Sequence, residues 1–350
     1  MLDMSDRRKR TPTDLAEEIS DGTLPRQFEF ILRIARSTFP SHVVVDAESQ
    51  SESDDIHVYV NSRNAALPGV ICSRAMRIAY WSTLALLAVM ILPAQPVDRN
   101  KPFPPHKVIG NVYFVGTADL GSYLITTSEG HILVNTDYET TVPQIRTGVG
   151  ELGFKFTDIK IILGSHAHGD HMEGDAMVKE LTGARVMAMA EDVPALKRMT
   201  PGGKPHPIDR VLHDGDDVKL GGSTLTAHLT PGHTKGCTTW SMKANEGGKT
   251  YDVVVVCSVG WNPGYILVNN KDYPEISNGY ARSFAKLRKL PCDIFLGAHS
   301  GFYNLAGKYP KLGHGGENPF FDHAGYLAYI DEKERSFQAE LSRQKAQQDK

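Results

Sequence analysis

Short apolar runs alternate with polar and glycine-rich segments from residue 95 onward, and this pattern predicts strands and helices in turn. Three strand-like runs separated by glycine or polar turns, as in a meander, are expected at 112–115, 122–126 and 131–134. Residues 140–154 carry apolar side chains at helical spacing, and the isoleucine-rich run 158–164 predicts a buried strand. The chain therefore begins this region with strands and a helix that can cover them.

The remaining pattern repeats this alternation. Further strands are expected at 185–190, 218–220, 223–229, 238–242, 251–256 and 293–297, and further helices at 172–184, 191–199, 273–290 and 320–347. Gly183 ends one helix, and Pro274 lies near the start of another, where proline is tolerated. Two successive halves of similar make-up predict an α/β fold in which two sheets pack together with helices outside, an αββα sandwich, in one domain over 95–350.

The first 94 residues differ from this pattern. Residues 1–75 contain a mixed charged run, an acidic polar stretch and no motif, which predicts a poorly ordered extension with a short helix over 25–38. A secretory signal peptide is expected at 76–94, because Arg74 and Arg77 precede an apolar run that is shorter than the ~20 residues of a spanning helix.

A signal peptide belongs at the start of a chain. We therefore expect Met76 to be the true start and 1–75 to result from an over-long gene prediction; the alternatives are an uncleaved membrane anchor and a buried helix. Cleavage of this signal predicts a periplasmic or secreted domain.

Charge and composition narrow the class of protein. The 350 residues include 38 Lys and Arg against 41 Asp and Glu, and a net charge of -3 argues against a nucleic-acid binder. Apolar residues make up 41% of the chain and charged residues 23%, as in an ordinary globular protein. We expect a monomer that acts on a small molecule, with no nucleic-acid partner and no membrane partner for the mature domain.

The stretch GSHAHGDHMEG, residues 164–174, concentrates four metal-binding side chains in six positions. If the chain stays extended after the preceding strand, His166 and His168 point to the same side. A tight turn then brings Asp170 and His171 to a second point beside the first. Two ligand pairs so close together predict two metal ions.

Two further histidines follow strands in the same way, His233 in LTPGHTKG and His299 in FLGAHSG. Five histidines and one aspartate form a ligand set that suits zinc, although residue type alone leaves iron and manganese open. The other histidines in this part of the chain lack such a context, and we assign no metal role to His206, His213, His228, His314 or His323.

The motifs H-A-H-G-D-H, P-G-H-T and G-A-H, from about residue 108 to the end, together resemble the metallo-β-lactamase superfamily, whose fold has two mixed sheets flanked by helices. Glyoxalase-like, lactonase-like and RNA-processing relatives have a metal-bridging aspartate after the strand that corresponds to 251–256. Here Cys257 and Ser258 stand at that place. The chain is thus most similar to the third subclass of class B β-lactamases, in which serine replaces a cysteine zinc ligand.

This resemblance implies two zinc ions, the first held by His166, His168 and His233, and the second by Asp170, His171 and His299. It implies a β-lactamase that attacks the amide of penicillins, cephalosporins or carbapenems with a zinc-bound hydroxide. Asp170 would orient the nucleophile, and Ser258 would hold a water or the substrate carboxylate. Asn262 and Tyr265 are expected to line the pocket, and residues 116–123 resemble a family loop near the site.

The resemblance also implies a Cys237–Cys257 disulfide, worth about 3 kcal/mol, which leaves Cys292 as the free thiol of the domain. The alternative is that Cys257 is a zinc thiolate.

Two other functions stay open. The first is a dizinc hydrolase of another ester, lactone, thioester or phosphoester, against which the missing aspartate counts. The second is a non-catalytic zinc-binding or storage protein, against which open coordination positions count, because structural zinc sites are usually closed.

Overall fold

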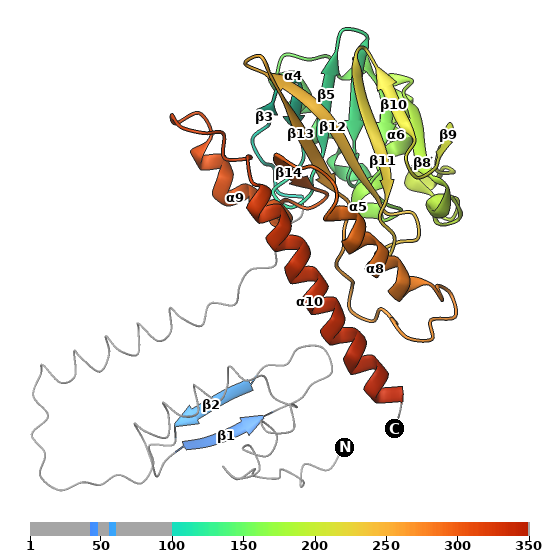
Figure 1. Ribbon diagram of the computed structural model, residues 1–350, viewed down its shortest axis with the longest axis vertical. Coiled ribbons are helices and arrows are strands. Elements are labelled where there is room, and N and C mark those ends of the chain that lie inside the picture. Colours follow the sequence, from blue (N-terminus) through green and yellow to red (C-terminus); the bar gives the residue numbers. More distant parts are fainter. Residues whose placement is uncertain (1–42, 48–55, 61–99, 349–350) are drawn as a thin grey trace, which may run out of the picture. The chain divides into compact units, whose positions relative to one another are not determined.

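The computed structural model of the chain describes residues 43–47, 56–60 and 100–348, and the chain divides into two units, residues 1–94 and 95–350. In the first unit, β1 (Val43–Ala47) pairs antiparallel with β2 (Ile56–Val60) (Figure 1). The expected signal peptide at 76–94 and the helix over 25–38 lie outside the described residues. Within the described part of the chain, no helix has the length and apolar character needed to cross a bilayer.

The second unit begins with a seven-stranded sheet in the order β3-β4-β5-β6-β7-β8-β9. The pairs from β3 to β6 are antiparallel, as in the expected meander, and those from β6 to β9 are parallel. The bounds are β3 (His106–Ile109), β4 (Val112–Phe114), β5 (Tyr123–Thr127), β6 (Gly130–Val134), β7 (Ile159–Leu163), β8 (Arg185–Met189) and β9 (Arg210–Leu212). The pattern did not predict β3 and β9, because each has at most four residues and two residues of β9 are exposed.

A five-stranded sheet follows in the order β10-β11-β12-β13-β14, antiparallel except for the parallel β13–β14 pair. The bounds are β10 (Asp217–Leu220), β11 (Ser223–Leu229), β12 (Thr238–Glu246), β13 (Lys249–Val256) and β14 (Ile294–Gly297). The β12–β13 hairpin is longer than expected, since its polar end pairs up to Glu246 and Lys249. Gly247 and Gly248 close it with φ of 58° and 77°, a backbone that a two-residue hairpin turn requires.

Helices cover the outer faces of both sheets (Figure 1). The seven-stranded sheet packs against α4 (Val142–Glu151) and α6 (Asp175–Thr182) through a separate apolar cluster. The five-stranded sheet packs against α8 (Ile276–Leu287) and α10 (His323–Gln348). The other helical segments are η1 (Glu139–Thr141), η2 (Phe156–Asp158), α5 (Gly169–Met172), η3 (Ala190–Asp192), α7 (Val193–Leu196), η4 (Pro201–Gly203), η5 (Ser300–Tyr303), α9 (Leu305–Lys308) and η6 (Tyr309–Lys311).

The expected helix over 172–184 is wrong at its start, because α5 and α6 are separate helices with Gly174 between them. A Cβ on Gly174 would lie 2.6 Å from the carbonyl oxygen of Thr136, so only glycine lets the chain approach the segment that follows β6. The segment 191–199 likewise forms two short pieces, η3 and α7, in place of one helix.

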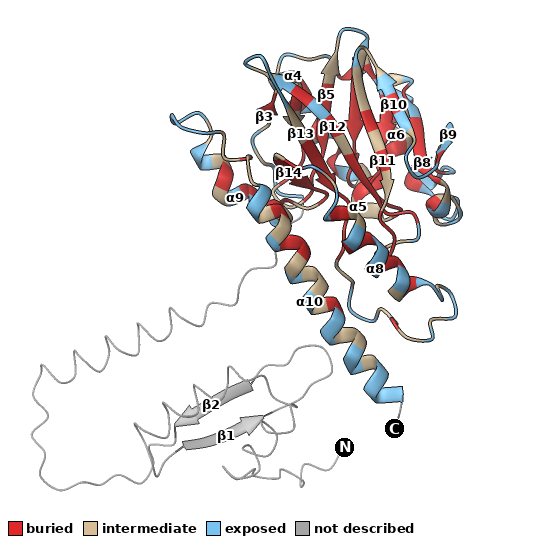
Figure 2. Cartoon of the chain, viewed as in Figure 1, coloured by how far each residue is buried: buried red, intermediate tan, exposed pale blue. Residues whose placement is uncertain are grey.

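The inner faces of the two sheets share one buried core, which includes Phe114, Ile161, Leu225, Trp240 and Val255 (Figure 2). Two mixed sheets flanked by helices confirm the αββα sandwich. Parallel strands end at one edge of a sheet, so the loops after β7 and β8 lie together, as do those after β13 and β14. The residues discussed next come mostly from these loops.

Candidate metal centre

Three histidines from two loops form a first cluster. His166 and His168 come from the loop after β7, and His233 comes from the turn after β11. One ring nitrogen of each lies within 4.8 Å of the others, and the ring centroids are 4.6 to 4.8 Å apart. The motif contains only His166 and His168. The structure brings His233 to them, although it is 65 positions beyond His168 in the sequence.

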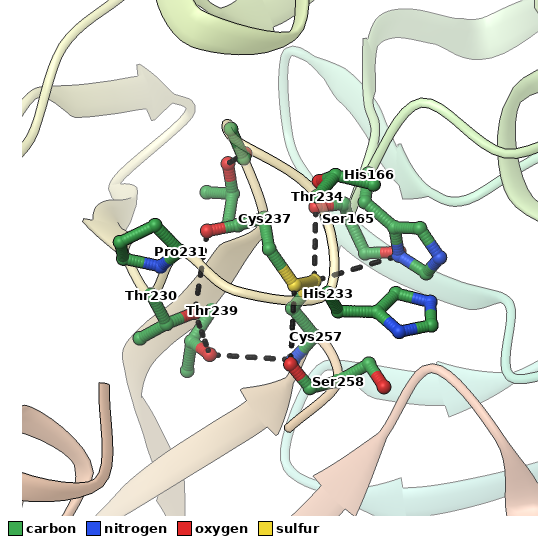
Figure 3. The surroundings of a disulfide bond; sticks show 12 residues. Ser165, His166, Thr230, Pro231, His233, Thr234, Cys237, Thr239, Cys257 and Ser258 are labelled. Atoms are coloured by element: carbon green, nitrogen blue, oxygen red, sulfur yellow. Dashed lines mark hydrogen bonds between the residues drawn. A yellow bond between two sulfur atoms is a disulfide. The ribbon is translucent and has the colours of Figure 1, made fainter. Parts of the chain in front are cut away.

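Hydrogen bonds orient two of these rings. Nδ1 of His233 lies 2.8 Å from the carbonyl oxygen of Gly260, so this nitrogen is the donor and Nε2 keeps its lone pair. Nδ1 of His166 lies 3.1 Å from Oγ of Ser165. Figure 3 shows the rings of His166 and His233 on the same side of the neighbouring disulfide. A hydrogen bond at the ring nitrogen that does not face the metal is the usual way to orient a metal-binding imidazole.

A second cluster joins Asp170 and His171, both in α5, to His299, which follows β14. Oδ2 of Asp170 lies 3.7 Å from Nε2 of His171 and 3.8 Å from Nε2 of His299, and the two ring nitrogens are 3.2 Å apart. A ring nitrogen of His166 also lies within 4.8 Å of ligand atoms of Asp170 and His171, so the two clusters adjoin.

These donors fit a divalent metal of the zinc type. Ligand atoms bound tetrahedrally to one zinc at about 2.0–2.1 Å lie roughly 3.4 Å from one another, which is close to the spacing of the second cluster. Nε2 of His166 is buried and has no hydrogen-bond partner among the described residues, a costly state that a bound cation would relieve. Imidazole and carboxylate donors also suit zinc chemically.

Burial keeps the histidines of the first cluster neutral. It lowers the pKa of His166 well below the usual value, and the neighbouring imidazoles lower it further. Burial and then His168 lower the pKa of His233 to about 4. Burial likewise lowers the pKa of His168, although Asp170 and Asp192 oppose it. Neutral rings at pH 7 keep the lone pairs that a metal needs.

A disulfide joins Cys237, which precedes β12, to Cys257, which follows β13, as the resemblance implied (Figure 3). The two Cα atoms are 5.9 Å apart. A sulfur in a disulfide is not a thiolate, so this arrangement counts against Cys257 as a zinc ligand. Of the cysteines that the structure describes, Cys292 alone is free, and it is buried.

The three residues expected to bind substrate, Ser258, Asn262 and Tyr265, differ in how close they come to the clusters. Ser258 is buried directly after the disulfide, and its Oγ lies 3.4 Å from the backbone N–H of Gly260. Tyr265 reaches the first cluster, because its hydroxyl donates to the carbonyl oxygen of His233 at 2.9 Å and its ring stacks near that histidine. Asn262 lies in an exposed turn, and no described contact brings its side chain to the clusters.

The loop 116–123 does lie beside the second cluster. Leu120 forms a β-bridge with His299, and Oδ2 of Asp119 lies 3.5 Å from Nδ1 of His299. Asp119 was not singled out from the sequence, although its loop was.

Sequence reasoning also missed two buried acidic residues. Asp137 follows β6, and burial raises its pKa to about 7. Asp192 follows β8 and is buried beside the first cluster. Both follow strands of the parallel half of the sheet. Because ligand sites often lie beyond the carboxyl ends of such strands, their position after a predicted strand could have identified them.

Comparison with known proteins places this arrangement in a family. The profile described as metallo-beta-lactamase superfamily matches residues 122–299. The structure is similar to native FEZ-1 metallo-beta-lactamase from Legionella gormanii, with 47% identity, a TM-score of 0.68, and coverage of 70% of this chain and 98% of that one. It is also similar to BJP-1, a subclass B3 metallo-beta-lactamase of Bradyrhizobium japonicum, with 36% identity, a TM-score of 0.67, and coverage of 71% and 98%.

The curated proteins that are similar in sequence are named hydroxyacylglutathione hydrolases. Hydroxyacylglutathione hydrolase of Cereibacter sphaeroides is 35% identical over 92 residues, which cover 26% of this chain and 31% of that protein. The same enzyme of a Methylobacterium species is 38% identical over 85 residues, which cover 24% and 29%. The matching region thus spans about a third of the length of each of these relatives.

Proposed function

The chain belongs to the metallo-beta-lactamase superfamily, and on this premise we propose that it is a dizinc β-lactamase. It hydrolyses the amide bond of penicillins, cephalosporins or carbapenems. The first zinc is held by His166, His168 and His233. The second is held by Asp170, His171 and His299.

The end of β13 carries this proposal. Relatives with other substrates, glyoxalase-like and lactonase-like enzymes, have a metal-bridging aspartate there, whereas this chain has Cys257 in a disulfide and then Ser258. A carboxylate between the clusters is thus missing at the place where those relatives supply one. The likeness to subclass B3 structures over nearly their whole length supports the same assignment.

Zinc, when bound, supplies a Lewis acid and lowers the pKa of bound water to roughly 7. The chain itself supplies orientation. Asp170 offers a carboxylate oxygen between His171 and His299 that can accept a hydrogen bond from the attacking water. Ser258 and Tyr265 are proposed to contact the substrate, Ser258 through its hydroxyl and Tyr265 through its ring. A serine nucleophile is not required.

A second candidate is a thioester hydrolase. The local identity to hydroxyacylglutathione hydrolases favours it, although those matches cover only 21% to 35% of the chain. The missing aspartate at the end of β13 counts against it. We propose it only as the alternative.

We further propose that the domain acts in the periplasm or outside the cell after removal of the signal peptide at 76–94. We propose that it acts there as a monomer on a small molecule. The disulfide supports an oxidising compartment, because cytosolic proteins rarely keep one. Fractionation of expressing cells, with N-terminal sequencing of the exported product, tests this. A product that stays in the cytosol, or that keeps Met1, would contradict it.

Hydrolysis assays test the function. We expect turnover of nitrocefin and imipenem that is lost on chelation and restored by zinc, with two zinc ions per chain by elemental analysis. A hydroxyacylglutathione thioester should react far more slowly. Preferred turnover of the thioester would favour the alternative, and zinc binding without turnover of any substrate would favour a storage role.

A further inference from the structure

The buried carboxylate of Asp192 binds both loops that supply the first cluster. Asp192 ends η3, and 3% of its surface is exposed. Its Oδ2 accepts the backbone N–H of Ala167 at 2.9 Å. Ala167 is the residue between His166 and His168, so this bond holds the backbone that carries both of those ligands.

The same carboxylate holds the loop of the third ligand. The hydroxyl of Thr234, the residue after His233, donates to Oδ2 of Asp192 at 2.8 Å. The backbone N–H of Gly236 donates to Oδ1 at 2.7 Å. One side chain therefore accepts three hydrogen bonds from two loops, whose donors Thr234 and Gly236 lie 67 and 69 positions beyond Ala167 in the sequence.

Gly236 lets the two segments approach this closely. A Cβ at that position would lie 2.5 Å from the backbone nitrogen of Asp192 and 2.7 Å from its Cβ and Cγ. Real Cβ atoms do not come so near to backbone, so the contact depends on glycine. The sequence GHTKG thus combines the proposed ligand His233 with a hydroxyl donor and a glycine that both contact Asp192.

We propose that Asp192 is a positioning residue that sets the separation of the His166–His168 loop and the His233 turn, and thereby the affinity of the first metal site. The proposal rests on the metal centre assigned above. It assigns no contact between Asp192 and the metal or substrate. Partners of this kind typically change metal affinity by about 10- to 100-fold when they are removed.

Asp192→Asn is the direct test. Both oxygens of Asp192 accept hydrogen bonds, so an amide NH2 group must face a donor whichever way it turns. We expect zinc titration against a chromophoric chelator to show a loss of about 10- to 100-fold in affinity for one ion, with a smaller change for the other. Asp209→Asn is the matched control, since Asp209 accepts the N–H of Val186 near the other end of β8, and it should bind zinc like the unaltered protein.

Variants of Thr234 keep the proposal testable if Asp192→Asn fails to fold in chelator-treated form. Thr234→Val removes one donor and should weaken zinc binding, whereas Thr234→Ser keeps the hydroxyl and should restore it. Unchanged zinc affinity in folded Asp192→Asn, or equal affinities in the two Thr234 variants, would overturn the proposal. Because the readout is zinc affinity, absence of β-lactam turnover in the unaltered chain would refute the proposed function and leave this inference standing.

Discussion

Sγ of Cys257 lies 3.4 Å from Nδ1 of His166, so the disulfide is packed directly behind a ring that faces the first cluster. The same sulfur lies 3.3 Å from the carbonyl oxygen of Ser165. The bridge also joins the strand that follows the His233 turn to the end of β13. It therefore stabilises the fold and the metal site at the same place.

Removal of this bridge should cost stability. We expect the double variant Cys237→Ser/Cys257→Ser to lose about 3 kcal/mol of unfolding free energy, because the crosslink closes a loop of 20 residues in the unfolded chain. Urea unfolding measures this, with Cys292→Ala as a control that keeps the disulfide. Thiol labelling of an unfolded, unreduced chain that starts at residue 95 should find one reactive cysteine, and three would disprove the bridge.

His168→Ala should abolish β-lactam turnover and lower the zinc content, because it removes a donor from the first cluster. Elemental analysis and nitrocefin hydrolysis measure the two effects. His314→Ala is the matched control, since His314 is exposed and belongs to neither cluster. Full activity of His168→Ala would show that the first site is assigned wrongly.

Tyr265 allows its hydroxyl and its ring to be separated. Tyr265→Phe removes the hydrogen bond to the carbonyl oxygen of His233 and should cost about 1 kcal/mol of stability, with zinc content kept. Tyr265→Ala also removes the ring, and we expect KM for the β-lactam to rise more than kcat falls. An unchanged KM in the alanine variant would exclude the ring from substrate binding.

His206 gives the stability of the domain a dependence on pH. Burial would lower its pKa, but Asp175, with Oδ2 3.2 Å from Nε2, acts together with the backbone of Met172 and Pro207 to raise the pKa above 6.5. A raised pKa means that the folded state holds the proton more tightly, so the stabilisation is complete below pH 6.5 and is lost as pH rises through the folded pKa.

His206→Gln isolates this effect. The difference in unfolding free energy between the unaltered protein and the variant should be largest on the acid side of pH 6.5 and should shrink above it. Urea unfolding of chelator-treated protein over this range measures the difference. A difference that grows toward alkaline pH would contradict the sign.

Local spacing predicted much of this molecule. The apolar runs of β7, β8 and the second half of β13 mark strands that are buried on both faces, whereas β11 alternates between buried and partly exposed residues. Both patterns depend only on neighbouring residues. By contrast, β3 and β9 are strands because a neighbour pairs with them, and their short sequences carry no such pattern. The break between α5 and α6 likewise depends on the approach of Gly174 to Thr136, which follows β6.

The sequence by itself determined the ligand types and the pairing of His166 with His168 and of Asp170 with His171, because these lie within six residues of one another. Only the tertiary structure decided which distant groups support them. Asp192 is 25 residues from Ala167 and 42 from Thr234, and it meets both because the parallel strands and the second sheet end at one edge. Contacts across such separations depend on how the sheets pack, which no local spacing encodes.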